Sequence, residues 1–593
     1  MIDKQASPER SGSLDPARPF FFEGLAGYFH PAGGSTAILL LSPWGYEELC
    51  SRKSYRMLGE KLAAAGYPCL RFDYPGTGNS AGRSDAVDDS SAWRTAVKTA
   101  LTELQRHTGA RRLLVIGQGV GASLAGVVAQ EASLAGLVLL APVLPGRAYL
   151  RELAAWTAMT QPTFLVNSSD GPEGGLMAGG FVLSRSTAEE LKTLNLLKVK
   201  LPAELPTLLM ERPDHPGDQK LADQLLEDGV SLERLPFDGY ADYVSDPTLS
   251  VVPEATLDRI VSWVRDRLPE DCANKKTASA DQVAPDNRWS ADGLNEELVR
   301  FGKGNMFFGA LTLPADKSVD TAVVILNSGY DHSIGWARMA VDFSRALAES
   351  GVAVLRVDLA GIGESRYWPD QQPQVLYSDR QVADVTAAVN WLSERLQVKR
   401  IILAGRCSGA YLTLLAAAQE PSVSAAFLIN PRRLVWDPDE DVDQAIREPI
   451  ETLGTYSQKL FENETVRRVL SGDINLLSAG KKVARALSTK ADKALAPVIR
   501  SLSKHHRLSS VLFNRLDSLQ NRNVPVCLVY SEGDRGLGEL ALWFGADTSG
   551  LKAYPNVTVA SIANADHNLT PLKARQEVET LLVDFASGVG RLD

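Results

Sequence analysis

Two stretches of this sequence occur twice at nearly the same spacing. Residues 69–80 (CLRFDYPGTGNS) resemble residues 354–365 (VLRVDLAGIGES) at an offset of 285 positions, and residues 112–122 resemble residues 400–410 at an offset of 288. Two matching blocks at almost one offset indicate a duplicated unit, and so long a period is that of a whole domain rather than of a short stacked repeat. The 593 residues are therefore predicted to contain two copies of one domain.

Each copy alternates short apolar runs with longer amphipathic stretches. In the second copy, strands are expected at 321–326, 352–357 and 401–404, and helices at 336–350, 382–396 and 410–419. In the first copy, the corresponding strands are expected at 37–41, 68–72 and 113–116, and helices at 54–65 and 91–106. This alternation predicts an α/β fold in each half, a mostly parallel sheet flanked by helices. Residues 145–200 and 435–521 are predicted to be helical inserts, or caps, over the strand ends where α/β sheets bind ligands.

The repeat and the local composition divide the chain into four segments. We expect an N-terminal tail at 1–17, a first α/β domain at 18–268, a linker at 269–290 and a second α/β domain at 291–593. The linker is predicted from a polar, aromatic-poor run, a composition typical of segments without a packed core.

The charge and the cysteine pattern narrow the function classes. The formal net charge of -10 argues against nucleic acid or an anionic membrane as the main partner. The N-terminus lacks the apolar core of a signal peptide, and no apolar run approaches the ~20 residues that span a bilayer. The five cysteines have neither zinc-ligand nor disulfide spacing. We therefore expect a cytoplasmic protein without an integral membrane segment, a metal or a cofactor.

The second copy carries a sequence typical of a nucleophile on a sharp turn. An apolar run is followed by Gly405-Arg406-Cys407-Ser408-Gly409 and then by a predicted helix. A strand, a G-x-nucleophile-x-G turn and a helix place the middle side chain at an exposed, strained corner, while the glycines allow close backbone packing on both sides. Cys407 occupies the middle position, where a thiolate would accept an acyl group.

Two residues further along have the order and loop positions that such a nucleophile needs. Asp534 follows the apolar run 524–530, and His567 follows the run 557–562. We predict that His567 is the general base and that Asp534 orients its ring. Glu532 and Glu539 are weaker alternatives to Asp534.

The oxyanion of an acyl-transfer intermediate needs two N–H donors. The first is expected to be Ser408, the residue after the nucleophile, and the second Gly329 or Tyr330, in the turn-rich loop after the first strand. His332 in the same loop could instead pair with Cys407, line the pocket or lie on the surface.

The first copy lacks the residues of this chemistry. Its turn reads Gly117-Gln118-Gly119-Val120-Gly121, so the nucleophile position is Gly119, which has no side chain to attack with. Its closing region, 237–247, contains no histidine. We predict that the first copy is catalytically inactive, although its loop 42–48 could still bind a ligand or form an interface.

These motifs resemble the α/β-hydrolase superfamily in both halves. Within it, residues 327–330, 338–351 and 354–365 of the second copy, and residues 42–48 and 72–80 of the first, are similar to the exosortase-system-associated and serine-aminopeptidase-like hydrolases. Those relatives usually carry serine at the turn. Cysteine there is similar to dienelactone hydrolases and polyhydroxyalkanoate synthases, the latter being acyltransferases that work from thioesters.

The sequence supports two hypotheses of different class. The first is an acyl-transfer enzyme, an ester or thioester hydrolase or an acyltransferase, that acts on a small acyl substrate through Cys407, His567 and Asp534. The alternative is a non-catalytic pseudo-hydrolase that binds a ligand or serves as a scaffold. A redox-sensing thiol is a third interpretation, although no second cysteine lies nearby in sequence. In either main case, the first copy could bind a partner enzyme or mediate self-association.

Overall fold

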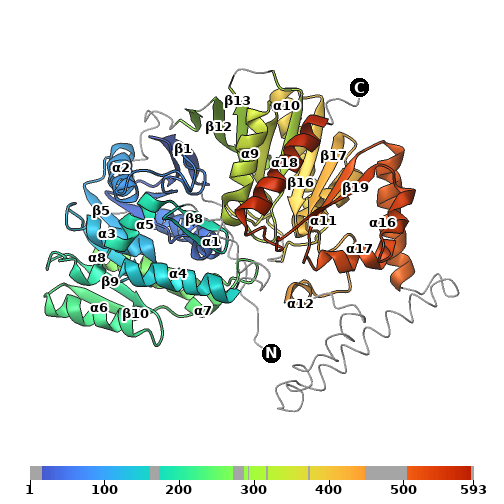
Figure 1. The fold of residues 1–593 in the computed structure, drawn as a ribbon. Helices are drawn as coiled ribbons and strands as arrows, with labels where there is room; N and C mark the ends of the chain where they lie inside the picture. The colour runs from blue at the N-terminus through green and yellow to red at the C-terminus, as the bar shows by residue number, and fades with distance from the viewer. Residues whose placement is uncertain are drawn as a thin grey trace, which may run out of the picture.

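The computed structural model describes residues 16–160, 173–270, 286–291, 293–315, 318–370, 374–447 and 504–588. In this part of the chain the two copies form two halves that lie side by side, each built on its own large sheet (Figure 1). The expected α/β fold in both halves is confirmed.

The first sheet has eight strands and is parallel except at one edge. In spatial order they are β1 (Arg18–Phe22), β2 (Leu25–His30), β4 (Cys69–Phe72), β3 (Thr36–Leu41), β5 (Arg112–Gln118), β6 (Gly136–Leu140), β9 (Thr207–Glu211) and β10 (Leu232–Pro236). Strands β1 and β2 are antiparallel to their neighbours. The central strands are nearly continuous apolar runs because helices cover them on both faces.

The second sheet repeats this order with nine strands. They are β11 (Arg288–Ala291), β12 (Leu294–Phe301), β13 (Phe307–Pro314), β15 (Ala353–Asp358), β14 (Thr321–Ile325), β16 (Arg400–Arg406), β17 (Val423–Ile429), β18 (Val526–Ser531) and β19 (Val557–Ile562). The first three are antiparallel. Strand β11 begins inside the expected linker, because residues 288–291 pair with β12. The proposed domain boundaries otherwise remain a prediction.

Helices cover both faces of each sheet. In the first half, α1 (Tyr46–Ala64) and α8 (Glu254–Arg267) pack on one face, and α2 (Ala92–Thr108), α3 (Val120–Val128) and α6 (Pro216–Glu227) on the other. In the second half, α9 (Met339–Glu349) and α18 (Leu572–Gly588) cover one face, and α10 (Arg380–Leu396), α11 (Ser408–Gln419), α16 (Lys504–Asn521) and α17 (Gly536–Phe544) the other. Helices α3 and α11 are buried almost all round, as their mainly small and apolar residues require.

The insert of the first half is not wholly helical as expected. It contains α4 (Gly146–Thr160), a hairpin of β7 (Leu176–Ala178) and β8 (Phe181–Leu183), and α5 (Arg185–Thr193). The hairpin forms because Gly179 and Gly180 both adopt positive φ in a two-residue turn between apolar strands. In the insert of the second half, α12 (Val442–Arg447) and α16 are described, and residues 448–503 lie outside the described residues.

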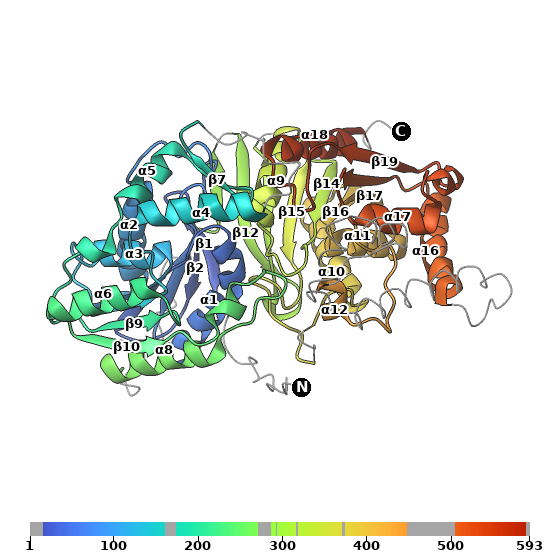
Figure 2. The ribbon, with the colours of Figure 1, turned by 60° about the horizontal axis from the view of Figure 1, so that its bottom comes forward.

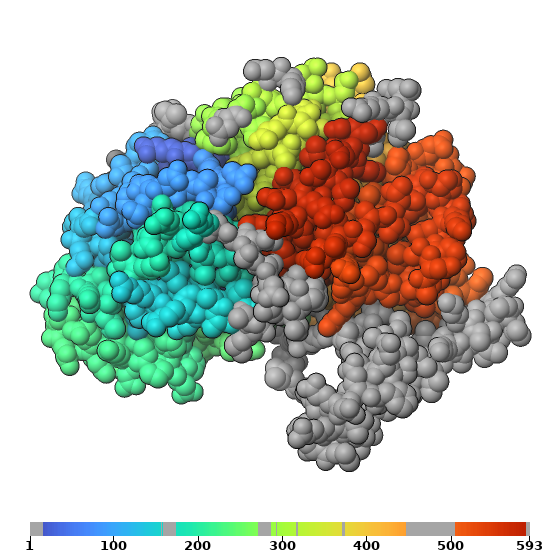
Figure 3. Space-filling view, viewed as in Figure 1, coloured from blue at the N-terminus to red at the C-terminus, as the bar shows by residue number. Residues whose placement is uncertain are grey.

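The two halves meet along the antiparallel edges of their sheets (Figure 2). A small apolar core joins them there, in which Tyr28 packs on Phe308 with ring centroids 5.8 Å apart. Trp336 forms a second contact, since its indole N–H donates to Gly179 O of the first half at 2.8 Å. On the face drawn in Figure 3, the blue and teal residues of the first half adjoin the yellow-green and red residues of the second along the upper part of their boundary.

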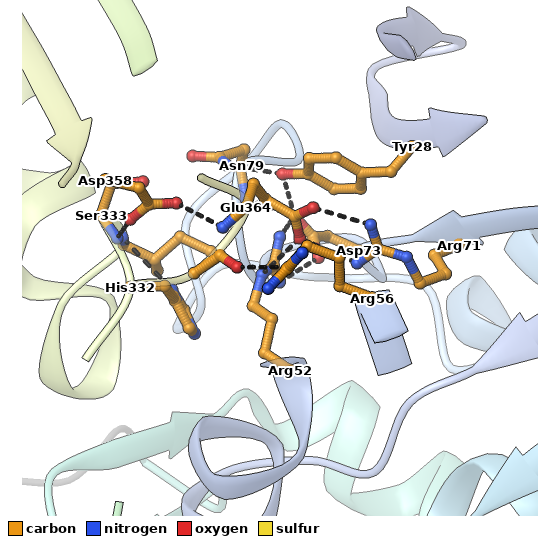
Figure 4. A network of polar contacts seen from close by, with 12 residues as sticks. Tyr28, Arg52, Arg56, Arg71, Asp73, Asn79, His332, Ser333, Asp358 and Glu364 are labelled. Atoms are coloured by element: carbon orange, nitrogen blue, oxygen red, sulfur yellow. Dashed lines mark hydrogen bonds and ion pairs between the residues drawn. The ribbon is translucent and has the colours of Figure 1, made fainter. Parts of the chain in front are cut away.

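The loops 73–80 and 358–365, one from each copy, contact the opposite half through related hydrogen bonds, and Figure 4 shows Asn79 and Glu364 of these loops among the polar side chains between the halves. Arg71 donates two hydrogen bonds to Glu364 at 2.8 and 2.7 Å. Its counterpart Arg356 donates to Asn79, the counterpart of Glu364, at 2.7 Å. In an isologous dimer, residue i of one subunit contacts residue j of the other, and residue j of the first subunit contacts residue i of the second. The interface therefore resembles that of a twofold dimer whose subunits are joined in one chain.

No described helix is both long enough and apolar enough to cross a lipid bilayer.

Candidate active site

Cys407 occupies the corner between β16 and α11. Its φ is 57° and its ψ is -118°, a region that side-chain-bearing residues rarely adopt, and its N–H is held by Ile429 O at 3.0 Å. The flanking glycines have little room. A Cβ on Gly405 would lie 2.4 Å from Gly409 O, and one on Gly409 would lie 2.3 Å from Asn327 O. The backbone packing therefore requires glycine on both sides of this strained corner.

His567 and Asp534 meet at the carboxyl ends of the neighbouring strands β18 and β19. His567 Nδ1 lies 2.5 Å from Asp534 Oδ2, and the ring N–H donates because the carboxylate can only accept. Asp534 is fixed by the Gly536 N–H, which donates to its Oδ1 at 2.6 Å. Asn430 Nδ2 donates to His567 O at 3.0 Å. The carboxylate thus sets the tautomer that leaves Nε2 as the basic atom of the ring.

The Cys407 thiol and the His567 ring influence each other's protonation. Burial raises the pKa of Cys407, but the charge of His567, with smaller contributions from Arg432 and Arg406, outweighs burial and lowers the pKa to about 7. Burial lowers the pKa of His567, but the charge of Cys407 and the hydrogen bond to Asp534 outweigh it and raise the pKa. Both directions favour a thiolate–imidazolium pair. Among the described residues, His567 Nε2 is buried without a hydrogen bond of ordinary geometry, and its contact with the Cys407 thiol, in addition to charge, contributes to both pKa shifts.

The expected oxyanion donors lie at the same corner, but one of them is engaged. Ser408 begins α11, so its N–H has no acceptor within the helix. The Gly329 N–H donates to Ser408 Oγ at 2.8 Å. The Tyr330 side chain points elsewhere, since its hydroxyl donates to Gln374 at 2.8 Å. The Ser408 hydroxyl must therefore turn aside before the Gly329 N–H can reach another oxygen.

The alternative acids and bases have other partners. His332 is buried with its Nε2 3.4 Å from Glu48 Oε2 of the first half, so it belongs to the interface. Glu539 accepts from the Leu434 N–H and the Trp543 indole, at 3.2 and 2.9 Å. Glu532 is exposed. Asp566 caps the loop by accepting from the Thr570 N–H at 2.8 Å.

Sequence reasoning missed the arginines around this site. Arg406, the variable residue of the G-x-C-x-G turn, donates to Asp331 Oδ2 at 3.1 Å and to Asn568 Oδ1 at 2.7 Å, and so ties the oxyanion loop to the histidine loop. A cavity of about 230 Å³ opens beside Cys407 and His567. Its walls include Arg406, Arg432, Arg433 and Arg535, and also residues 246–249 of the first half. A run of basic residues at 432–433 was the only available signal for part of this wall.

The corresponding corner of the first half is filled. Gly119 has φ 56° and ψ -122°, nearly the torsions of Cys407. A Cβ on Gly119 would lie 2.8 Å from Glu47 Oε2, so a carboxylate occupies the space beside the missing nucleophile. Glu47 also accepts from Gln118 Nε2 at 2.8 Å and from the Tyr240 hydroxyl at 3.3 Å, and burial raises its pKa. The site is thus an internally bonded polar cluster.

Comparisons with known proteins agree with this architecture. Residues 37–178 match the family model described as serine aminopeptidase, S33, and residues 321–571 match that of the alpha/beta hydrolase fold. Similar solved structures include dienelactone hydrolase from Anabaena variabilis ATCC 29413, 15% identical over 49% of this chain and 97% of its own, with a TM-score of 0.30. Est1E from Butyrivibrio proteoclasticus is 16% identical over 49% of this chain and 98% of its own, with a TM-score of 0.29. No curated protein sequence matches the chain. With one family match in each half, the chain belongs to the α/β-hydrolase superfamily as a tandem pair.

Proposed function

We propose that the second half catalyses acyl transfer through an S-acyl intermediate on Cys407. The observation that carries the proposal is a half-buried thiol on a strained corner, with its pKa lowered to about 7 by an imidazole that is itself bonded to Asp534 at 2.5 Å. A thiolate is the reactive form of cysteine, and a thiol with this pKa is about half ionised at pH 7.

The reaction follows from these positions. The Cys407 thiolate attacks the carbonyl carbon of an ester or thioester, and the resulting oxyanion accepts from the Ser408 N–H and a second N–H at Gly329 or Tyr330. The C–O or C–S bond to the leaving group then breaks, and His567 gives its proton to that group. Water, an alcohol or an amine next attacks the thioester while His567 takes the proton, and the thiolate leaves. The acceptor decides between hydrolysis and transfer.

The charge around the cavity favours a small acyl substrate with an anionic group. Arg406 is balanced by Asp331 at 3.1 Å, and Arg433 lies 3.4 Å from Glu440. The same wall also includes Arg432, Arg535 and the carboxylate of Asp246, so among the described residues its four arginines outnumber its two carboxylates, Asp246 and Asp331. Carboxylate- or phosphate-bearing esters are therefore the first to screen. The reaction fits a reducing compartment such as the cytoplasm, because the thiol must stay unoxidised.

The first half is proposed to be catalytically inactive, because Gly119 has no nucleophile and Glu47 fills its place. Whether this half also binds a partner enzyme or a second copy remains a prediction.

Covalent trapping tests the proposal. Incubation with p-nitrophenyl acetate should release p-nitrophenol in a burst, with an acyl group located on Cys407 by peptide mass spectrometry. Cys407→Ala should abolish the burst. Cys527→Ala is the matched control, since burial raises the pKa of that thiol and its loss should change nothing. An intact protein that takes up no acyl group from any ester or thioester would instead favour the non-catalytic binding protein.

A further inference from the structure

A turn of the catalytically inactive half lies against the cavity of the other half. Asp246, Pro247, Thr248 and Leu249 line the same cavity as Cys407 and His567. A Cβ placed on Gly329 would lie 2.9 Å from Thr248 Oγ1, so Thr248 packs directly on the expected oxyanion loop. Residues more than 150 positions apart in sequence thus share one cavity wall.

The turn is held in shape by its own half. The Thr248 N–H donates to Asp246 Oδ1 at 2.8 Å, which closes a local side-chain turn. The Tyr46 hydroxyl donates to Ser245 O at 2.7 Å, and Ser250 Oγ donates to Tyr243 O at 2.6 Å. Contacts at both ends therefore fix the backbone that presents Thr248 to the cavity.

The interface keeps the turn in place relative to Cys407. Arg338 of the second half donates to the carbonyls of Gly78, Ser80 and Gly82 at 2.9, 2.6 and 2.7 Å. The paired Arg71 and Glu364 are both buried (Figure 4). Charged groups bonded in this way resist separation, because breaking them would leave buried charges without partners.

The position of the turn in the fold explains its origin. It lies between β10, the last strand of the first sheet, and α8, after the short helix α7 (Tyr240–Tyr243), while the His567 loop lies between β19, the last strand of the second sheet, and α18. The segment that carries the histidine in one copy therefore reaches across the interface in the other.

We infer that the first half completes the substrate pocket of the second, with Thr248 limiting the size of the acyl group that reaches Cys407. This inference rests on the proposed acyl-transfer function. It gives the half without a nucleophile a direct role in selectivity, since Thr248 faces the space that an acyl chain on Cys407 would occupy.

The test compares small and large reagents on full-length variants. Thr248→Phe should slow acylation by p-nitrophenyl octanoate about tenfold more than acylation by p-nitrophenyl acetate, because the added ring would narrow the space for the longer acyl chain and a misfit in a binding pocket changes rates to roughly this extent. Thr248→Ala should shift the ratio of the two rates the opposite way. Val251→Phe adds the same ring three residues later, at a side chain that is 57% exposed and does not line the cavity, and should leave the ratio unchanged.

A second pair of reagents separates this inference from the proposed function. Iodoacetamide and N-benzyliodoacetamide both alkylate a thiolate with loss of iodide, and they need no acyl-transfer chemistry. If no ester acylates the wild-type protein, the proposed function fails, yet Thr248→Phe should still slow the benzyl reagent selectively. Equal slowing of both reagents by Thr248→Phe, or the same ratio in Thr248→Phe and Val251→Phe, would overturn the inference.

Discussion

The corners at Gly119 and Cys407 have nearly the same backbone torsions at the same place in two equivalent sheets. At Cys407 the side chain borders an open cavity and lies near an imidazole that is bonded to a carboxylate. At Gly119 a buried carboxylate fills that space and is bonded to a glutamine and a tyrosine. The corner is therefore a property of the scaffold, and the neighbouring side chains decide whether it supports chemistry.

The comparison also separates strain from function. A residue with a side chain at φ 57° costs of order 1–3 kcal/mol, whereas glycine adopts such torsions readily. The second half retains this cost at Cys407, and the first half avoids it at Gly119. Retained strain in only one of two equivalent corners is the pattern expected where the side chain has a function.

The largest effect is expected at Asp534, the carboxylate bonded to His567, because the corner of the first half has no such carboxylate–imidazole pair among its described residues. Asp534→Asn should lower the rate of Cys407 acylation by about a thousandfold, because the ring would lose the partner that fixes its tautomer and stabilises its charge. The measurement is the p-nitrophenol burst rate. Asp566→Asn is the control, since asparagine can replace aspartate as a cap and both carboxylate oxygens of Asp566 accept from Thr570. Equal rates for Asp534→Asn and wild type would place the orienting acid elsewhere.

A second effect distinguishes the two related contacts at the interface. Glu364→Ala should lower the free energy of unfolding by about 3 kcal/mol, because Arg71 and Arg52 would keep buried charges without their shared carboxylate. Asn79→Ala, at the equivalent position, should cost less, about 2 kcal/mol, since it removes two hydrogen bonds of a neutral side chain, one from Arg356 and one to the Tyr28 hydroxyl. Urea denaturation of both variants measures the difference. Similar losses would mean that the charge of Glu364 adds nothing to the symmetric contact.

Local pattern was sufficient for the second corner. The apolar run, the two glycines and the helix that follows predicted the position of Cys407, and chain order predicted the meeting of Asp534 and His567. Each signal lies within a few residues, or follows from strand ends that gather at one edge of a parallel sheet. The roles of these residues remain proposals.

Contacts between the halves could not be predicted in this way. Strands β12 and β13 were missed because their buried positions are covered partly by the other half, as where Phe308 packs on Tyr28. Glu296 is buried within β12 and bonds to Arg345 at 2.6 Å, so its charge hides a core-facing position from a pattern of apolar residues. Thr248 lies in a loop without periodicity, and only the three-dimensional packing brings it to Gly329.

A third effect concerns the thiol pKa, which differs between Cys407 in the second half and Cys50 in the first. Alkylation of Cys407 should fall as the pH drops through about 7, because the thiolate is the reactive form and its pKa lies there. In His567→Ala the main lowering charge is gone while burial remains, so the midpoint should move up by more than one pH unit. Iodoacetamide labelling across pH 5–9 measures both. Cys50 in the first half is the internal reference, because burial and nearby carboxylates raise its pKa and it should stay unlabelled.

The smallest effect tests the filled corner of the first half. Gly119→Ala should lower the free energy of unfolding by about 2 kcal/mol, since the new Cβ has an unfavourable φ and would lie 2.8 Å from Glu47 Oε2. Gly109→Ala is the matched control, with φ 61° and no atom within 4 Å of the new Cβ, and should cost about 1 kcal/mol. Thermal unfolding of both variants separates the cost of the positive φ, which both share, from the cost of the contact with Glu47. If the two variants lose the same free energy of unfolding, Glu47 moves away from the new Cβ without cost. The Glu47 side chain would then not prevent a nucleophile from occupying position 119.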